Sequence, residues 1–530
     1  MTQEPSQLFG EIRSLMQAPP SSGAWLAMTS LIDACERLDP RFLEDVVTPY
    51  VMAHILSWPV ELRVAPQHWV EALFSSDPPA HGRIVTALKL MQRGLSDKDI
   101  LHMSQHPTLS QMHWLDLSHN WLMESGAEHL CRSPHAHNLG TLDLSYNQLK
   151  DSGAARFAGT NALNRLHTLS LARNDLTLKG FLAMQQARFV PRMRSLDLSS
   201  NWLRVSHADD AFFTHDFQHL RRLDLSNNQL GDRGITLMLR QDAEHLPALE
   251  ELTLHHTGLT AHAMEDVAQS MITSQLRVLD LSDNHIQSQG LHTLMESSHL
   301  RQLEHLSLKN TGNANDAILA LCDTPHLTSL RHLNLAKTSL GVLGAELLAN
   351  STNLQALVSL ELQGNELGRE AMNHLVRWAG LGRLVELDLA HNELDTWALM
   401  TLLEGLDTSA RLETLTLDHN QLLPRTGTEH HTTELERLDL SKLSPGLRNL
   451  SMINCQLNDR ALDKLLSSGR INDLSLLDLR YNAISDGFVY ALLQHLSPEA
   501  ELTLDLRYTS LTMQGILALQ EELPQCHLIR

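Results

Sequence analysis

The segment Met112-His-Trp-Leu115-Asp-Leu117-Ser-His-Asn120-Trp-Leu122 decides the fold, because its pattern of leucines and one asparagine returns along the chain. It follows the template LxxLxLxxNxL, whose positions we number from one, so that Asn120 occupies position nine. With a degenerate first copy at Arg93, twelve of the fifteen intervals between successive ninth positions are 27 residues. Such a regular period predicts a repeat architecture. The ninth positions are Asn120, Asn147, Asn174, Asn201, Asn228, Thr257, Asn284, Thr311, Thr338, Asn365, Asn392, Asn420, Cys455, Asn482 and Thr509.

The template has a physical explanation. Leucines at positions four and six alternate with polar residues, which predicts a short strand with one buried face. Successive copies stack these strands into a parallel sheet. Position nine follows the strand and turns inward, where its side chain has to satisfy backbone groups, and an Asn amide both donates and accepts hydrogen bonds. We therefore interpret the ten asparagines at position nine as a structural ladder and not as catalytic residues.

The second half of each repeat is predicted to be helical, as in Leu343-Gly-Ala-Glu-Leu-Leu348. The residue six places after position nine is Gly or Ala in twelve of fifteen copies, which allows the start of the helix to pack closely behind the sheet. Helices are about 10 Å wide, whereas neighbouring strands are about 4.8 Å apart. The stack must therefore curve. The sequence predicts an α/β solenoid, a horseshoe with a parallel sheet on its concave side and helices on its convex side.

This pattern resembles the leucine-rich repeat family, and the repeat length of 27–29 residues with Asn, Thr or Cys at position nine is similar to its ribonuclease-inhibitor type. The resemblance covers about residues 81–530. It implies a non-catalytic scaffold that binds a protein partner on the concave face.

Composition limits the possible functions. The chain has 530 residues, 107 of them Leu, and a formal net charge of −21, which disfavours nucleic acid as a partner. The sequence contains no run of 18 or more apolar residues, so it predicts no membrane span. The five cysteines show no CxxC spacing, and the start shows no secretory signal, so we expect a cytoplasmic protein. Export by a non-classical route is the alternative.

Residues 1–80 differ from the rest, with only nine leucines. Helices are predicted at Ser30–Leu38, Leu43–Trp58 and Trp69–Phe74. A solenoid needs a cap at its end, so we interpret this region as a helical N-terminal cap. The rival is a small recruiting module, which would make the chain an adaptor or a secreted bacterial-type effector. Residues 81–530 then form the solenoid of about 15–16 repeats.

Two segments depart from the repeat. His207-Ala-Asp-Asp-Ala-Phe-Phe213 replaces a helix start. An irregular insertion lies near residues 421–443, where Leu435–Leu440 imitates a strand, but Leu447–Cys455 keeps the phase of the following copies. We therefore expect the strand to lie within Leu447–Cys455.

The sequence lacks nucleotide-binding, hydrolase and metalloprotease motifs, which predicts no enzyme activity, cofactor or resident metal. Histidines do pair in register, at His305 with His332 and at His391 with His419. Such pairs can approach one metal ion, but no third ligand is evident. A metal-dependent enzyme is the least favoured hypothesis.

Positions three, five, seven and eight are expected to face the hollow. Position five carries nine acids in fifteen copies, which predicts a negative field and a partner with a basic surface. The middle repeats replace acids with neutral residues and gather His and Lys, and both ends carry aromatic residues of the kind enriched at binding hot spots. The predicted binding residues are Trp114, Asp116, Asp143, Tyr146, Asp197, Asp224, His255, His256, Asp280, His305, Lys309, His332, Lys337, Asp388, Arg480, Tyr481, Arg507 and Tyr508.

Overall fold

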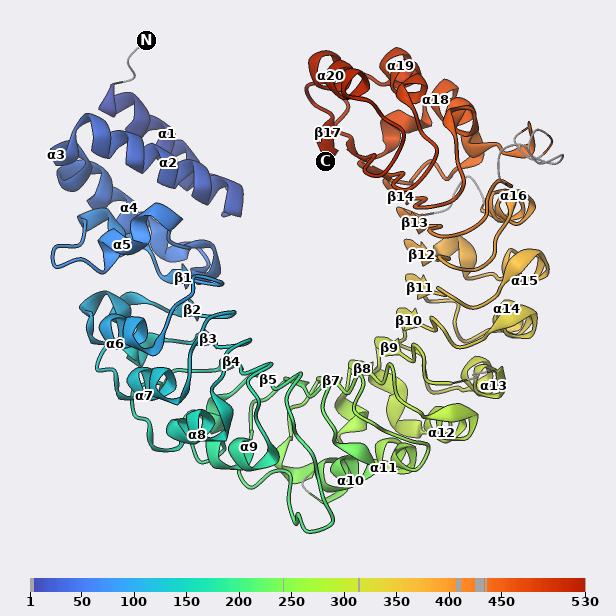
Figure 1. Cartoon of the computed structure of the whole chain (residues 1–530). Coiled ribbons are helices and arrows are strands. Elements are labelled where there is room, and N and C mark those ends of the chain that lie inside the picture. The colour runs from blue at the N-terminus through green and yellow to red at the C-terminus, as the bar shows by residue number, and fades with distance from the viewer. Residues whose placement is uncertain are drawn as a thin grey trace. The chain divides into compact units, whose positions relative to one another are not determined.

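The computed structural model describes residues 4–241, 243–312, 315–406, 411–424, 433 and 436–529. The chain divides into two compact units, Met1–Leu249 and Glu250–Arg530, and each is described by itself. In both units, parallel strands form one face and helices cover the other, as Figure 1 shows. The predicted fold class, an α/β solenoid with strands and helices on opposite sides, is confirmed.

The first unit begins with helices and continues with alternating strands and helices. Its strands are β1 (Ala87–Lys89), β2 (Trp114–Asp116), β3 (Thr141–Asp143), β4 (Thr168–Ser170), β5 (Ser195–Asp197) and β6 (Arg222–Asp224). Its helices are α1 (Pro5–Gln17), α2 (Ser22–Leu38), α3 (Pro40–Phe42), α4 (Thr48–His54), α5 (Val70–Leu73), α6 (Asp97–Gln105), α7 (Glu124–Arg132), α8 (Lys150–Ala155), α9 (Leu178–Met184) and α10 (Gly231–Ile235).

The second unit repeats the same alternation. Its strands are β7 (Glu251–Thr253), β8 (Val278–Asp280), β9 (His305–Ser307), β10 (His332–Asn334), β11 (Ser359–Glu361), β12 (Glu386–Asp388), β13 (Thr414–Thr416), β14 (Asn449–Ser451), β15 (Leu476–Asp478), β16 (Thr503–Asp505) and β17 (His527–Ile529). Its helices are α11 (Ala263–Gln269), α12 (Gln287–Met295), α13 (Asn315–Asp323), α14 (Gly341–Asn350), α15 (Gly368–Leu375), α16 (Thr396–Gly405), α18 (Asp463–Ser467), α19 (Asp486–His495) and α20 (Met513–Glu522).

Each strand from β1 to β16 consists of positions three to five of the template, and neighbouring strands pair at equal positions. Leu115 of β2 lies opposite Leu142 of β3, which lies opposite Leu169 of β4. These position-four leucines are at most 1% exposed, so they form the core between sheet and helices. Close packing of the helices requires small residues: a Cβ on Gly290 of α12 would lie 2.7 Å from the Cα of Ala261.

The asparagines at position nine join consecutive repeats. The amide of Asn120 donates to the carbonyl oxygens of Leu90 and Leu117, both at 2.9 Å. Its oxygen accepts hydrogen bonds from the backbone N–H groups of Arg93 and Leu95, both at 3.0 Å. All ten of these asparagines are buried. Because these bonds cross from one repeat to the next, the ladder fixes the backbone where each strand has ended.

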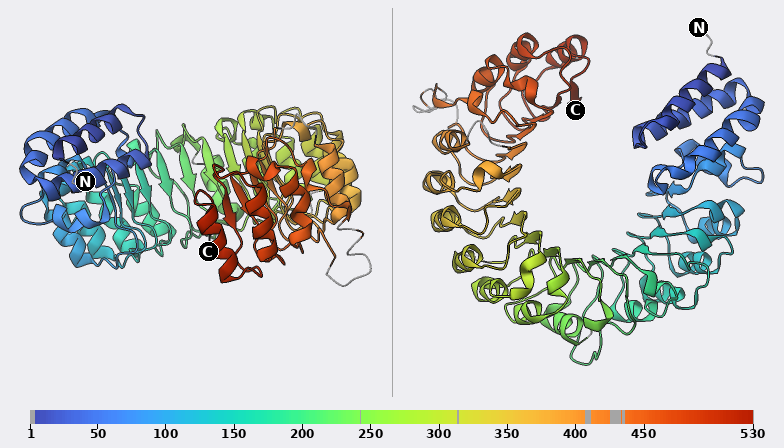
Figure 2. Two further views of the ribbon diagram at one scale, coloured as in Figure 1. Left: turned by 90° about the horizontal axis from the view of Figure 1, so that it is seen from above. Right: turned by 180° about the vertical axis from the view of Figure 1, so that it is seen from behind.

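The N-terminal region contains more helix than the sequence predicted. Helix α1 was not predicted, and α2 begins at Ser22 instead of Ser30. The two helices lie side by side in both views of Figure 2 (dark blue). The region joins the sheet because Val64 forms a parallel bridge with Ala87, and the indole of Trp25 donates to the Val64 carbonyl oxygen at 2.8 Å.

The two irregular segments have different outcomes. Between β5 and β6 no helix forms in the segment around His207; instead Phe212, Phe213 and Phe217 are buried, with ring centroids 5.4 to 6.4 Å from Phe181. After β13 the next strand is β14, paired with β13 through Thr414 and Asn449. Residues 425–432 of the insertion lie outside the described residues.

Candidate protein-binding surface

The acids at position five end the strands. In each of the predicted aspartates one carboxylate oxygen accepts the backbone N–H of position seven in the same repeat, as Asp116 does from Ser118 at 2.9 Å and Asp388 from Ala390 at 2.8 Å. The predicted Asp143, Asp197, Asp224 and Asp280 make the same contact. These side chains therefore stabilise the turn after the strand, in addition to giving the surface its charge.

Burial and crowding change the acidity of this row. Burial, followed by the like charges of Asp116 and Asp197, raises the pKa of Asp143 above its ordinary value. Burial and the charge of Asp388 likewise raise the pKa of Glu361, and burial raises that of Asp388 itself. The negative field is thus created against an electrostatic cost that the fold has to offset.

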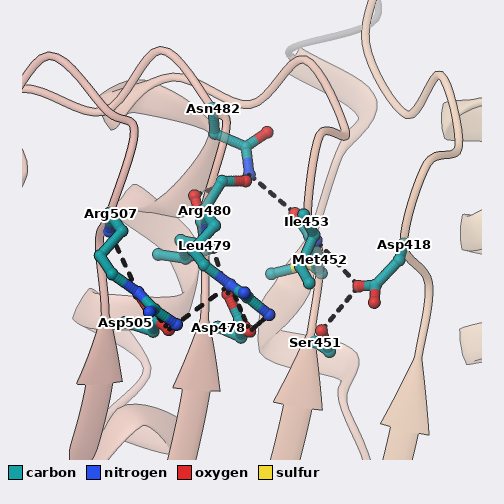
Figure 3. Close-up of polar contacts among 10 residues, drawn as sticks. All are labelled: Asp418, Ser451, Met452, Ile453, Asp478, Leu479, Arg480, Asn482, Asp505 and Arg507. Carbon is teal, nitrogen blue, oxygen red and sulfur yellow. Dashed lines mark hydrogen bonds and ion pairs between the residues drawn. The ribbon is translucent and has the colours of Figure 1, made fainter. Parts of the chain in front are cut away.

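Asp418 takes over this role where position five lacks an acid. Strand β14 ends in Ser451, which has no carboxylate to accept the backbone N–H of Ile453 at position seven. That N–H donates to Asp418 of the neighbouring repeat at 2.9 Å, and the hydroxyl of Ser451 donates to the same carboxylate at 2.6 Å (Figure 3). Asp418 was not predicted from the sequence, because its carboxylate reaches across from position seven of another repeat.

The two arginines predicted as hot spots hold carboxylates of the sheet. The guanidinium of Arg480 donates to both oxygens of Asp478 at 2.7 to 3.0 Å and lies 3.4 Å from Asp505. Arg507 donates to Asp505 at 2.6 Å (Figure 3). Burial alone would raise the pKa of Asp505, but hydrogen bonds and charge from Arg507 and Arg480 outweigh it and lower that pKa. The four groups form a nearly neutral layer of fixed ion pairs.

Position eight is exposed in most repeats, and its backbone is left-handed in every full repeat. Its φ angles lie between 50° and 67°, from His256 to Gly364. This conformation turns consecutive side chains into one row, so that neighbouring rings stack. The rings of Tyr481 and Tyr508 lie 4.5 Å apart at 9°, and their side chains are 52% and 69% exposed.

The row contains two further stacks, in which Tyr146 is a predicted binding residue, His391 and His419 were noted only as a histidine pair, and His119 was not predicted. In the first unit, the ring of Tyr146 stacks on that of His119, with their centroids 3.9 Å apart. The guanidinium of Arg173 lies 5.1 Å from the centroid of the Tyr146 ring. In the second unit, His391 stacks on His419 at 4.2 Å. Trp114, by contrast, is half-buried, with the Lys89 ammonium 4.8 Å from its ring.

A shallow hollow of about 560 Å³ lies beside this row in the first unit. His119 and Tyr146, from position eight, line it together with Trp121 and Asp175, from position ten. Trp121 is 63% exposed and was not among the predicted residues. Position ten varies between repeats, so no pattern in the sequence marks it, and only the exposure of a large aromatic side chain identifies it.

The histidines in the middle contact each other or a carboxylate. His305 and His332 stack at 3.9 Å, and burial together with the neighbouring His305 lowers the pKa of His332. His255 lies 3.2 Å from Asp283. Within the described ranges, no group of three or more His, Cys, Asp and Glu side chains is placed to hold a metal ion. Lys309 and Lys337 occupy positions seven and eight nearby, and the charge of Lys309 acts to lower the pKa of Glu361.

Four segments match the family profile described as Leucine Rich repeat, namely residues 135–158, 218–239, 275–295 and 326–349. Together with the period and the stacked strands, these matches show that the chain is a leucine-rich repeat protein. Among curated proteins, none matches this sequence. In the part of the chain that the structure describes, no helix combines the length and apolar character needed to cross a membrane.

Several solved structures are similar to this chain. TLR13 in the TLR13-ssRNA13 complex is 20% identical, with a TM-score of 0.48, over 84% of this chain; the match spans 62% of the TLR13 chain. An internalin of Listeria monocytogenes is 18% identical, with a TM-score of 0.41, over 67% of this chain and 96% of its own. A leucine-rich repeat protein of Leptospira interrogans is 21% identical, with a TM-score of 0.38, over 80% of this chain and 96% of its own.

Proposed function

We propose that this protein is a non-catalytic scaffold that binds a protein partner on its strand face, and that Tyr481 and Tyr508 are the main anchors. The observation that carries the proposal is the exposure of these two stacked rings. Tyrosine is enriched among the residues that dominate binding energy at protein interfaces. Repeat proteins commonly use their extended concave surfaces for binding.

The surroundings of the two tyrosines support this role. Their rings are held in place by stacking, and the left-handed backbone at φ 58° and 59° fixes where they point. The ion pairs at position seven leave no unpaired arginine beneath them. A surface ordered before binding loses less conformational entropy when the partner arrives. The tyrosines therefore combine exposure with preorganisation.

The rest of the proposal concerns partner and location. The position-five carboxylates favour a partner with a basic surface, which they attract before contact. The scaffold carries out no reaction and holds no cofactor. We assign it to the cytoplasm, where its cysteines stay reduced, and to the ribonuclease-inhibitor type of leucine-rich repeat, from its repeat length.

A second candidate function uses the N-terminal region. We propose the region up to residue 80 primarily as the cap of the solenoid, because Val64 and Trp25 attach it to the first strand. The same region exposes Leu26 and Leu56, at 63% and 78%. These leucines favour an additional recruiting role. Replacing both with Ser would remove one specific partner if the region recruits, and no partner if it only caps.

The main test is a double substitution, Tyr481→Ser with Tyr508→Ser. The partner is first identified by affinity purification of the whole chain and mass spectrometry, and its affinity is then measured by titration. We expect binding to weaken by at least about 2 kcal/mol, roughly thirtyfold, while the melting temperature changes little.

The matched control is Tyr490→Ser, because Tyr490 is 49% exposed but lies on helix α19, outside the strand face. It should leave the affinity unchanged. If the double variant melts earlier and the folded fraction binds normally, the tyrosines cover the end of the core and the proposal is wrong.

A further inference from the structure

A row of position-two residues crosses the start of the strands in the first unit. Backbone hydrogen bonds connect its members from repeat to repeat: the N–H of His113 donates to Thr86 at 2.8 Å, and that of Gly140 donates to His113 at 2.8 Å. The N–H of Thr86 donates to Arg63 at 3.1 Å. The row continues through His167 to Arg194, whose N–H groups donate at 2.9 and 2.7 Å. We call Arg63, His113, His167 and Arg194 the position-two row.

The arginines of the row are cationic in a chain whose net charge is −21. Burial, followed by the charges of Arg63 and Arg165, lowers the pKa of His113, so Arg165 belongs to the same neighbourhood. Burial and the charge of Arg194 lower the pKa of His167. Among the described residues, no carboxylate forms an ion pair with Arg63, Arg165 or Arg194. The carboxylate of the exposed Glu61 does act at longer range, because its charge tends to raise the pKa of Arg63 and of His167.

Arg63 is the member of the row with a buried guanidinium that lacks a hydrogen-bond partner at Nε among the residues that the structure describes. Its side chain is buried, the residue being 7% exposed, and its Nε has no hydrogen-bond partner in the described part of the chain. Burying a guanidinium without pairing it is unfavourable, and an anion that approaches it offsets that cost. An arginine in this state is therefore an observation in favour of an anionic ligand, independent of the charge of the row.

Gly140 gives the row its shape. A Cβ on Gly140 would lie 2.7 Å from Nε2 of His167. The absent side chain leaves room for the imidazole of His167 to lie over the neighbouring strand, in the direction of His113. The row thus presents imidazole nitrogens between two arginines, and both kinds of group donate hydrogen bonds to carboxylates.

We propose that the position-two row binds a short acidic segment of a protein partner. From Arg63 to Arg194 the row spans five strand spacings, about 24 Å, which an extended peptide of roughly seven residues covers. The position-five acids of the same strands lie three residues further on, about 10 Å away. A broad polyanion such as nucleic acid would face those acids, whereas a narrow peptide avoids them.

This site is separate from the proposed tyrosine anchors, which lie in the second unit. The proposal for the position-two row therefore does not depend on the proposal for the tyrosines. A partner that lies on the strands of the first unit would meet cations at position two and carboxylates at position five, and so would present both signs of charge in a fixed order.

The experiment is a fluorescence anisotropy titration of the whole chain with a labelled oligoglutamate peptide at low salt. Arg165→Gln with Arg194→Gln should weaken binding about tenfold, since each lost charged hydrogen bond at a partly exposed site contributes about threefold. Gly140→Ala, which displaces His167 without changing charge, should also weaken it. Both arginines are exposed, so the double variant keeps the wild-type melting temperature.

The matched control is Arg188→Gln with Arg204→Gln, which removes the same charge from two other exposed arginines of the first unit. We expect its affinity to stay within about twofold of the wild type, since only general screening changes. Equal affinity of the row variant and the control, or no binding of oligoglutamate at all, would overturn the proposal. Tighter binding of a single-stranded oligonucleotide of equal charge would overturn the partner class.

Discussion

Replacing Asn147 with Ala tests how the ladder supports the fold. Asn147 is 6% exposed, and its amide donates to the carbonyl oxygens of Leu117, Leu144 and Ser145 at 2.9 to 3.2 Å. Its oxygen accepts the N–H of Leu122 at 3.0 Å. The substitution removes all four hydrogen bonds, but the groups they leave behind are not equally affected.

Each of the three carbonyl oxygens keeps another donor. Leu117 still accepts from Asn120, Leu144 from Asn174, and Ser145 from the N–H of His119. Only the N–H of Leu122 is left buried without its partner. An orphaned buried N–H costs about 1–3 kcal/mol, and this is the destabilisation we expect.

The assay is hydrogen exchange of the peptide that contains Leu122, read by mass spectrometry, next to urea denaturation of the whole chain. A destabilisation of this size speeds exchange roughly 5- to 150-fold if opening is local. Binding by the folded molecules should stay intact. Unchanged exchange and stability with loss of binding would refute the structural interpretation of these asparagines.

Four further predictions follow from named contacts. Ser200 has φ 55°, so Ser200→Val should lower the free energy of unfolding by about 1–2 kcal/mol, and Ser200→Gly should not; equal urea midpoints would contradict the left-handed turn. The raised pKa of Asp388 means that its contribution to stability is complete below the ordinary carboxyl pKa and is lost as pH rises through the raised pKa. Asp388→Asn should therefore raise the melting temperature more at neutral than at mildly acidic pH, and an equal rise at both would count against buried charge. Arg480→Ala leaves Asp478 and Asp505 short of a partner, so it should lower the melting temperature more than the exposed Arg460→Ala does; equal melting would show that the ion pairs contribute nothing. Asp197→Asn with Asp280→Asn should slow association with the partner, as added salt does, and change dissociation less; a salt-independent rate measured by stopped flow would remove the charge argument.

Sequence was sufficient for the regular part of the fold. The period placed the strands, because Leu115 and Leu117 can be buried together only if the polar residues between them face away. Phase alone predicted β14 at Leu447–Cys455 instead of Leu435–Leu440, and the described strand is Asn449–Ser451. Helix α1 was missed, since it buries only Leu8 and Ile12 and contains Gly10 in its interior.

The surface was less predictable, because its arrangement depends on contacts between repeats. Arg480 and Tyr481 are adjacent in sequence, yet one is held in ion pairs and the other is exposed. The left-handed backbone at position eight did leave a signal. Asn227, Asn310 and Gly364 occupy that position, and Asn and Gly are the residues that tolerate positive φ best. Nothing in the pattern indicates that Asp418 serves a neighbouring repeat.

The central claim is that the strand face at Tyr508 binds the partner. The most direct measurement is photocross-linking in cells, with p-benzoylphenylalanine introduced at Tyr508 in one variant and at Tyr490 in another. The two sites belong to neighbouring repeats and are both exposed, but only Tyr508 lies at position eight. We predict one specific protein adduct from position 508 and none from position 490. An adduct from position 490 alone would contradict the account, because the partner would then bind the helical face.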